Sequence, residues 1–185
     1  MLYRGLSHHA RRAVWMSPGF RVAQIMAAIF TVAAVSAFMP LWFADRGLSP
    51  SEIGQVLGLA SLFRVISGPG WGTMADRVGR RRPVMTFAAC TAMAMSLTYT
   101  VVYSFTPILL VAAVLAIAAS ALGPLADSLA LALTREGKME YGPVRAAGSI
   151  SYMVVTAAAG QGLAHLGAAV VPWLQALGYA LAAVF

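Results

Sequence analysis

Charge is what this sequence lacks most. Only 10% of its 185 residues are charged, whereas 60% are hydrophobic. A soluble domain has about 25% charged residues, so this chain carries too little charge to cover a surface that faces water. Acids are the scarcer kind, with 6 Asp and Glu against 13 Lys and Arg. A basic excess is found in nucleic-acid-binding proteins, but basic residues beside apolar stretches are typical of membrane proteins, and we expect no nucleic-acid partner.

Cysteine is nearly absent as well. The single Cys90 lies within an apolar stretch, which excludes a disulfide framework and a cysteine-based metal site. The sequence also contains no metal-ligand cluster, nucleophile motif or phosphate-binding loop of known spacing. We therefore predict no cofactor, no metal site and no enzymatic activity.

Long apolar stretches are what the sequence has instead. About 17–25 apolar residues cross the hydrocarbon layer of a bilayer as a helix, and the lack of period-two alternation argues against a β-barrel. The sequence predicts an all-α membrane protein with six transmembrane helices, over residues 20–43, 52–75, 83–103, 107–134, 141–165 and 168–185. Ser49, Pro50 and Glu52 have the spacing of a helix start, and Pro40 is expected to kink the end of the first span.

Basic residues gather on one side of the predicted spans, whereas the loops on the other side contain only Arg46. Cytoplasmic loops are the ones enriched in Lys and Arg. This predicts a multi-pass protein of the cytoplasmic (inner) membrane with both termini in the cytoplasm and residues 1–19 as a cytoplasmic segment. The basic residues on that side are Arg4, Arg11, Arg12, Arg21, Arg77, Arg80, Arg81, Arg82, Arg135, Lys138 and Arg145.

The loop after the second span has the sequence GTMADRVGRRRP, residues 72–83. It resembles the signature between the second and third spans of the major facilitator superfamily, in which a glycine precedes an Asp-Arg pair, a second glycine and two or more basic residues. The resemblance implies a charge cluster that latches the two halves of a transporter in one conformation. Membrane topology alone is the alternative explanation. The matching residues are Gly72, Asp76, Arg77, Gly79, Arg80 and Arg81.

Two further pairs of stretches resemble phenylpropionate-permease-type members of this superfamily, and the second pair also resembles lactose-permease-like proton symporters. FMPLWF (38–43) with GLSPSEIG (47–54) is similar to their first loop, and PLADSLA (124–130) with YGPVRAAGS (141–149) to their fourth and fifth spans. Such permeases have about twelve spans in two halves around a central site. The resemblance implies that this chain forms the N-terminal six-helix bundle and requires a second six-span half, either another chain or a second copy.

Arg64 and Asp127 lie deep within predicted spans, where charge is costly and functional roles are common. Arg64 is midway along the second span, and it is either the counter-ion of an anionic substrate or proton carrier, or a structural partner of Asp127 or of a backbone carbonyl. Asp127 is the only acid well within a span. A partly desolvated carboxylate suits proton coupling or substrate contact, with a structural ion pair as the alternative.

The fifth predicted span has a polar stripe. Arg145, Ser149, Tyr152 and Thr156 recur at the spacing of one helix face, which predicts that this face lines a cavity or, alternatively, packs against another span. The resemblance to lactose-permease-like symporters implies that Asp127, Arg145 and Tyr152 contact the substrate.

Aromatic residues cluster at the end of the first predicted span. Phe38 and Trp42 share one helix face, which places them along an outer cavity in one interpretation. In the other, Trp42 and Phe43 belong to the aromatic belt at the membrane interface, and we favour the belt.

Taken together, the sequence predicts a secondary active transporter, proton-coupled through symport, for a small organic solute. Arg64 and Arg145 favour an anionic or hydroxylated substrate over a cation, and the resemblance implies an aromatic acid. The alternatives are a sugar or nucleoside symporter, and a truncated or half-sized membrane subunit that transports nothing alone.

Overall fold

The structure, a computed structural model, describes residues 17–184. Residues 1–16 of the expected cytoplasmic segment 1–19 lie outside the described residues, and so does Phe185. Within the described range the chain forms helices joined by short turns, and no strand occurs there. The helices are α2 (Pro18–Ser36), α3 (Met39–Asp45), α4 (Pro50–Val78), α5 (Arg81–Thr98), α6 (Phe105–Ala119), α7 (Leu122–Arg135), α8 (Tyr141–Leu166) and α9 (Val171–Val184), with 3₁₀ turns η1 (Tyr99–Val101) and η2 (Ala168–Val170). The all-α prediction is confirmed.

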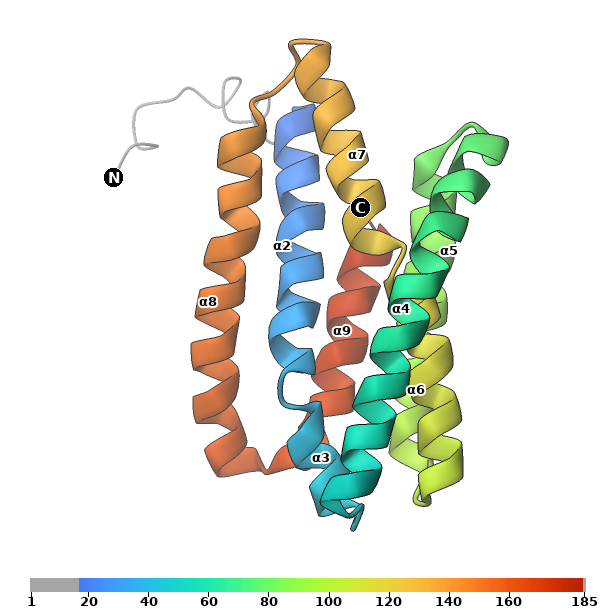
Figure 1. Cartoon of the computed structure of the whole chain (residues 1–185). Helices are drawn as coiled ribbons and strands as arrows, with labels where there is room; N and C mark the ends of the chain where they lie inside the picture. The colour runs from blue at the N-terminus through green and yellow to red at the C-terminus, as the bar shows by residue number, and fades with distance from the viewer. Residues whose placement is uncertain (1–16, 185) are drawn as a thin grey trace.

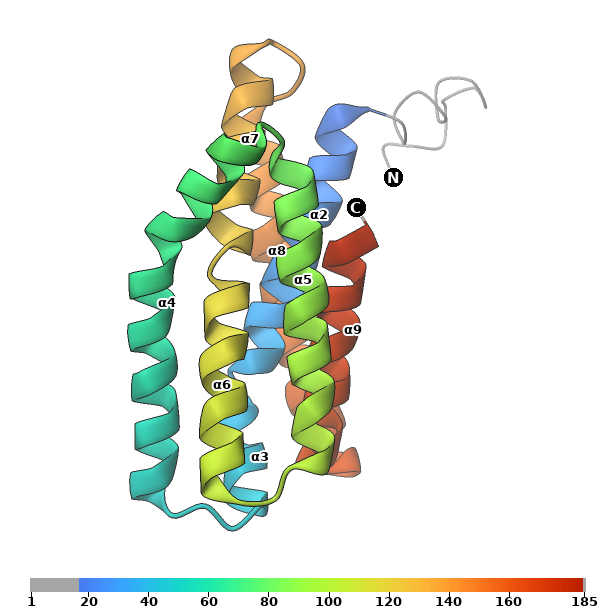
Figure 2. The same ribbon diagram turned by 90° about the vertical axis from the view of Figure 1, so that its right-hand side faces the viewer.

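The helices run up and down in one bundle (Figure 1). Figure 2 shows α4, α6, α5 and α9 side by side on one face. In Figure 1, α8 lies at one edge, next to α2, and α4 lies toward the other. These two helices contribute little to the core, since the buried residues of α4 are Val56 and Ala75 and those of α8 are Val144 and Gly148.

The start of α4 is as the sequence predicts. Ser49 is the N-cap, its hydroxyl accepts from the backbone N–H of Glu52, and the Glu52 carboxylate accepts from the backbone N–H of Ser49 at 2.8 Å. This reciprocal capping box satisfies two N–H groups that a helix start leaves without an internal partner.

Two of the predicted spans are each divided into two helices. The first is interrupted at Ala37–Phe38, between α2 and α3, so the predicted kink near Pro40 is confirmed. The fourth, predicted over 107–134, coincides with the apolar stretch Phe105–Arg135, within which α6 ends at Ala119 and α7 begins at Leu122. Pro124 explains the second break, since its nitrogen cannot donate to the carbonyl of Ser120 and its ring crowds that carbonyl.

The expectation of six transmembrane helices is met only in part. By length and composition, three helical stretches among residues 17–184 are long and apolar enough to cross a membrane, namely Pro18–Asp45, Arg81–Val101 and Phe105–Arg135, and Ala168–Val184 is apolar but shorter. The helices α4 and α8 are long, with 29 and 26 residues, but they contain Arg64 and Arg145 along with many glycines and hydroxyl side chains. They are the two edge helices, where a polar face does not have to enter the core of this bundle.

The aromatic residues at the end of the first span are buried rather than interfacial. Trp42 is 1% exposed and Phe43 is 2% exposed, and both contact Tyr99 of η1, with ring centroids 5.3 and 5.9 Å apart. The prediction that they form part of a membrane-interface belt is therefore wrong. The turn between α2 and α3 directs both rings inward, which helical spacing alone does not reveal.

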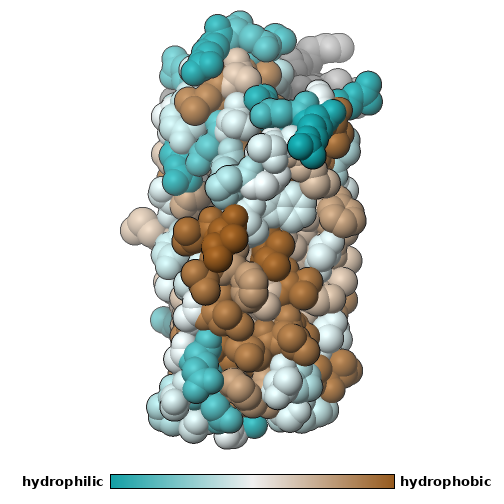
Figure 3. Space-filling view, turned by 45° about the vertical axis from the view of Figure 1, so that its right-hand side comes forward, coloured by the Kyte–Doolittle hydropathy of each residue, from teal (hydrophilic) through white to brown (hydrophobic). Residues whose placement is uncertain are grey.

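Charged side chains are concentrated at the two ends of the bundle, as the hydrophilic areas at the top and bottom of Figure 3 and the hydrophobic area between them illustrate. The start of α2, the α4–α5 loop and the α7–α8 loop share one end, which we call the basic end. Its described basic residues are Arg21, Arg77, Arg80, Arg81, Arg82, Arg135 and Lys138. Arg46 lies at the opposite end, where its guanidinium carbon is 4.6 Å from the ring centroid of Trp42 and 4.4 Å from that of Tyr103.

Candidate functional site

Arg64 of α4 borders a cavity in the middle of the bundle. The cavity has a volume of about 400 Å³ and is lined by α2, α4, the α6–α7 break and α9. Its polar lining groups include Ser36 and Tyr179, and a second cavity of about 100 Å³ shares Ser36, Arg64 and Tyr179 with it. We call the two together the Arg64 cavity. A concave, mostly apolar space with few polar groups is the usual form of a small-molecule site.

The guanidinium of Arg64 has no hydrogen-bond acceptor or ion-pair partner among the described residues. In that range the one ion pair within 4.0 Å joins Lys138 to Glu136, so the structural pair of Arg64 with Asp127 that the sequence left open does not form. The side chain of Arg64 is exposed along the cavity. A cation within a membrane-spanning segment is expensive unless a partner neutralises it, and the role of Arg64 as counter-ion of an anionic substrate or proton carrier stays a prediction.

The α6–α7 break forms one wall of the Arg64 cavity and is tied to α4. The indole N–H of Trp71 donates to the carbonyl of Ile117 at 2.7 Å, and the hydroxyls of Ser67 and Ser120 are 2.9 Å apart. The hydroxyl of Ser120 also donates to the carbonyl of Ile117 at 2.7 Å. These contacts occupy a carbonyl at the end of α6, which would otherwise lack a partner in an apolar environment.

A buried amide on the other side of the cavity was missed by the sequence reasoning. Gln175 of α9 is 2% exposed; its Nε2 donates to the hydroxyl of Ser36 at 2.8 Å and its Oε1 accepts from the hydroxyl of Ser96 at 3.1 Å. These bonds join α9 to α2 and α5. The signal that would have revealed it is a lone Gln in the otherwise apolar last span.

Asp127 lies apart from the Arg64 cavity, toward the basic end. The hydroxyl of Tyr141 on α8 donates to its Oδ1 at 3.0 Å. The guanidinium of Arg145 instead stacks on Phe30 of α2, with its carbon 4.5 Å from the ring centroid, and makes no ion pair with Asp127 within 4.0 Å. The structure therefore brings Asp127 next to Tyr141 and leaves its proton-coupling role a prediction.

The polar stripe of α8 lies beside the face that packs on α2. The ring of Phe30 packs so closely on Gly148 that a Cβ atom there would lie 2.9 Å from Cδ2 of the ring. The hydroxyl of Ser151 donates to the carbonyl of Ala27 at 3.1 Å. Ser149 and Tyr152 are exposed and do not line the Arg64 cavity. Their contact with a substrate stays a prediction that requires another surface opposite α8.

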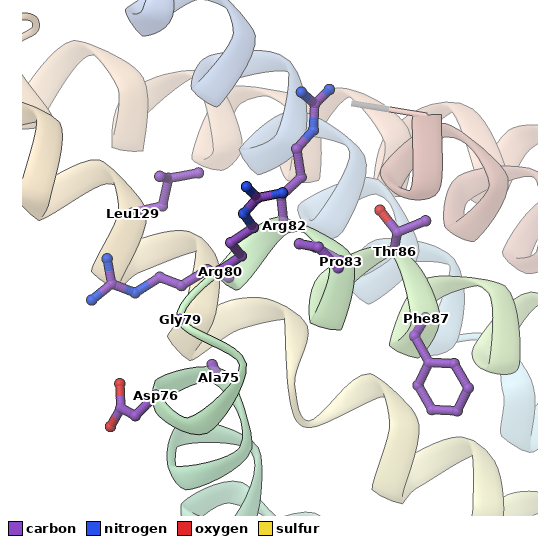
Figure 4. A pocket seen from close by; sticks show the side chains of 10 residues that line it. Ala75, Asp76, Gly79, Arg80, Arg82, Pro83, Thr86, Phe87 and Leu129 are labelled. Atoms are coloured by element: carbon purple, nitrogen blue, oxygen red, sulfur yellow. The ribbon is translucent and has the colours of Figure 1, made fainter.

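The signature loop forms a sharp turn at the basic end. Gly79 ends α4 with φ of 69°, a left-handed conformation that glycine adopts without strain, and Arg80 is extended before α5 begins at Arg81. The loop borders an open hollow of about 960 Å³ that reaches Leu129 of α7 (Figure 4). Gly72, one turn before Asp76 on α4, borders a smaller cavity. This cavity has a volume of about 170 Å³ and is also lined by Asp76, Arg81 and Ser128.

The arginines of the loop do not pair with its acid in this structure. Asp76 forms no ion pair within 4.0 Å with any described arginine, and Figure 4 shows its carboxylate and the side chain of Arg82 pointing in different directions. The latch assigned to Gly72, Asp76, Arg77, Gly79, Arg80 and Arg81 therefore stays a prediction.

Comparison with known proteins identifies the family. Residues 25–185 match the family described as "MFS_1 like family". The chain belongs to this family. Among relatives of the MFS_1-like chain, the "Uncharacterized transporter YwbF" of Bacillus subtilis (strain 168) is 31% identical over 119 residues, which is 63% of this chain and 29% of that protein. The maltose permease of Geobacillus stearothermophilus is 30% identical over 145 residues, which is 77% of this chain and 36% of that protein.

A shorter match joins this MFS_1-like chain to the lactose permease of Klebsiella pneumoniae, with 37% identity over 57 residues, 30% of this chain and 44% of that protein. These relatives are named as transporters and permeases, which supports a membrane transporter fragment rather than an enzyme. The chain spans about a third of the length of the first two relatives.

Proposed function

We propose that the chain is the N-terminal six-helix half of a secondary active transporter that moves a small organic solute across the cytoplasmic membrane by proton symport. Its membership of an MFS_1-like family supports the transporter role. In this arrangement α2–α3, α4, α5, α6–α7, α8 and α9 are the six spans, and the basic end faces the cytoplasm. Both termini then lie on the cytoplasmic side.

The observation that carries the proposal is the unpaired Arg64 at the central cavity. Guanidinium binds carboxylates through two parallel hydrogen bonds, and in an apolar cavity this attraction is weakly screened. The apolar lining suits the hydrocarbon part of the same molecule. The substrate we propose is a small organic acid, such as an aromatic carboxylate.

Asp127 is the proposed proton carrier. It is half-buried, lies well within the fourth predicted span and is held by one neutral hydroxyl, that of Tyr141. No described cation forms an ion pair with it, so its charge is not locked by a structural partner. A carboxylate in such a place can exchange a proton between two conformations of the transporter.

A sugar is the second candidate substrate. The support comes from the printed names of two relatives, a maltose permease and a lactose permease, and from the exposed Ser149 and Tyr152 of α8. Hydroxyl and aromatic side chains are suited to a polyol ring. In this version the stripe of α8, rather than Arg64, makes the principal contacts.

A second six-span half is part of the proposal. The chain corresponds to about a third of two relatives, and the polar faces of α4 and α8 lie at the edges of this bundle. A partner, either a separate six-span chain or a second copy in parallel orientation, would cover them. Crosslinking in membranes is expected to give a dimer band or a band with that chain, and monomer bands alone would contradict this part.

The test is uptake by proteoliposomes with an imposed inward proton gradient, with radiolabelled phenylpropionate and maltose as substrates. The chain is reconstituted alone and with a second six-span half, as wild type, Arg64→Gln and the control Arg135→Gln, an exposed arginine at the basic end. We expect Arg64→Gln to lower phenylpropionate uptake more than tenfold, because a charge-assisted bidentate contact contributes about 1.5–3 kcal/mol. Uptake of phenylpropionate that is unchanged in Arg64→Gln would refute the anionic site, and uptake of maltose alone would favour the sugar.

A further inference from the structure

An apolar groove with arginines at its rim lies at the basic end, apart from the Arg64 cavity. It has a volume of about 260 Å³ and lies between the first turns of α2 and α5, with α7 and α9 beside them. Its floor is formed by Val22, Ile25, Met85, Leu133 and Ala182, and its rim carries Arg21 and Arg82. Arg82 also borders the hollow beside the signature loop, so the two spaces adjoin.

The rim charges have no acidic partner among residues 17–184. Arg21 and Arg82 are exposed and neither forms an ion pair within 4.0 Å there. Of the acids at this end, Glu136 is held by Lys138 at 2.7 Å, Asp76 points away from Arg82 in Figure 4, and Glu140 before α8 forms no ion pair with either arginine. The sequence before Ser17 contains no Asp or Glu. The rim is therefore a concentrated positive charge beside an apolar floor.

The first turns of α2 and α5 add positive potential to this groove, whereas the last turns of α7 and α9, which supply Leu133 and Ala182, add negative potential. The first turns of α2 and α5 contain no acid, although the positive end of a helix dipole favours acids there and disfavours cations. The first turn of α5 instead begins with Arg81 and Arg82, and its N-cap, Arg80, makes no side-chain capping bond. An anion outside the protein would relieve this repulsion.

We propose that this groove binds one anionic phospholipid, with the phosphate group between Arg21 and Arg82 and part of an acyl chain against the apolar floor. A free phosphate would explain the arginines but would leave the apolar lining of the groove, which includes the half-buried Leu129 and Leu133, without an apolar occupant. An uncharged acyl chain would explain the floor but not the rim. Basic pockets between membrane helices on the cytoplasmic side are known to take anionic headgroups, and the basic end is where such headgroups lie. Arg82 then has a role beyond topology.

The test uses the full chain purified in detergent with phosphatidylcholine, titrated with phosphatidylglycerol, phosphatidylcholine or inorganic phosphate while the melting temperature is recorded. Phosphatidylglycerol is expected to raise the melting temperature saturably, and the other two to leave it unchanged. In Arg21→Gln/Arg82→Gln the apparent affinity for phosphatidylglycerol should fall about fivefold for each arginine removed, in line with the contribution of one basic residue at a membrane surface. The control Arg77→Gln/Arg135→Gln removes two exposed arginines of the same end that do not line the groove, and it should bind as the wild type does.

Several outcomes would overturn the proposal. An equal rise in melting temperature with phosphatidylcholine would show that the groove does not distinguish the headgroup charge. An equal rise with inorganic phosphate would show that the groove binds an anion without its acyl chain. Loss of affinity of the same size in both double variants would show a general surface effect. No shift with any lipid would show that the groove is filled otherwise, for instance by another part of the chain. The lipid comparison on the wild type needs no variant, so a variant that fails to fold leaves the proposal testable.

Discussion

The hydroxyl group of Tyr141, the first residue of α8, donates a hydrogen bond to Oδ1 of Asp127 on α7 over 3.0 Å. This bond closes the turn between the two helices and gives the carboxylate one neutral partner. Arg145, one turn further along α8, is directed to Phe30 of α2 instead. Between these residues the carboxylate of Asp127 therefore has a hydrogen bond from Tyr141 and no ion pair with Arg145.

Replacing Asp127 with Asn should separate proton coupling from substrate passage. The amide keeps the size of the side chain and can still accept from Tyr141, but it cannot exchange a proton. We expect proton-driven uptake to fall to background while counterflow exchange of labelled for unlabelled substrate survives, measured in the proteoliposomes described above. Tyr141→Phe is the matched control, since it removes the hydrogen bond, leaves the carboxylate and should lower stability by only about 1 kcal/mol. Full proton-driven uptake by Asp127→Asn would refute the proposal that Asp127 carries the coupled proton.

Gly178 of α9 is where α9 approaches α2 closely. A Cβ atom at this position would lie 2.5 Å from Cγ2 of Val32, and the χ1 of a helical valine is stiff. Gly178→Ala should therefore destabilise the bundle by about 1–3 kcal/mol, seen as a lower melting temperature in detergent.

Two further variants make the Gly178 experiment decisive. Gly162→Ala on α8 meets nothing within 4 Å, so it should be neutral or stabilising by up to about 1 kcal/mol through helix propensity. Val32→Ala combined with Gly178→Ala should recover most of the lost stability. If the double variant is as unstable as Gly178→Ala, the contact with Val32 is not the cause.

Gln175 should be a stability residue of the bundle. Gln175→Leu keeps the approximate volume but removes the bonds to Ser36 and Ser96, and polar bonds between membrane helices contribute about 0.6–1.7 kcal/mol. We expect a melting temperature lower than that of the wild type. Gln161→Leu on α8, an exposed position, is the control and should change little. Equal stability of Gln175→Leu and the wild type would mean that the network contributes nothing net.

The predictions that succeeded depend on local chemistry. The helix start at Ser49 was readable because capping involves residues three positions apart, and the break near Pro40 because a proline lacks the donor that a continuous helix needs. The break before Pro124 follows from the same rule, but hydropathy does not show it because the apolar stretch around it is uninterrupted. The inward position of Trp42 was misjudged because hydropathy does not distinguish a lipid-facing ring from a core ring.

By itself the sequence determined the all-helical class, the position of most helices, the clustering of basic residues at alternate loops and the resemblance to the major facilitator superfamily. All of these are set by composition and by spacings of a few residues, which hydropathy and backbone hydrogen bonding translate directly into structure. Only the tertiary structure decided that Arg64 borders a cavity without an ion-pair partner among residues 17–184, that Gln175 joins three helices and that Arg21 and Arg82 share one groove. Those relationships join residues about 60 to 140 positions apart, and the packing of side chains between helices, rather than any local preference, brings them together.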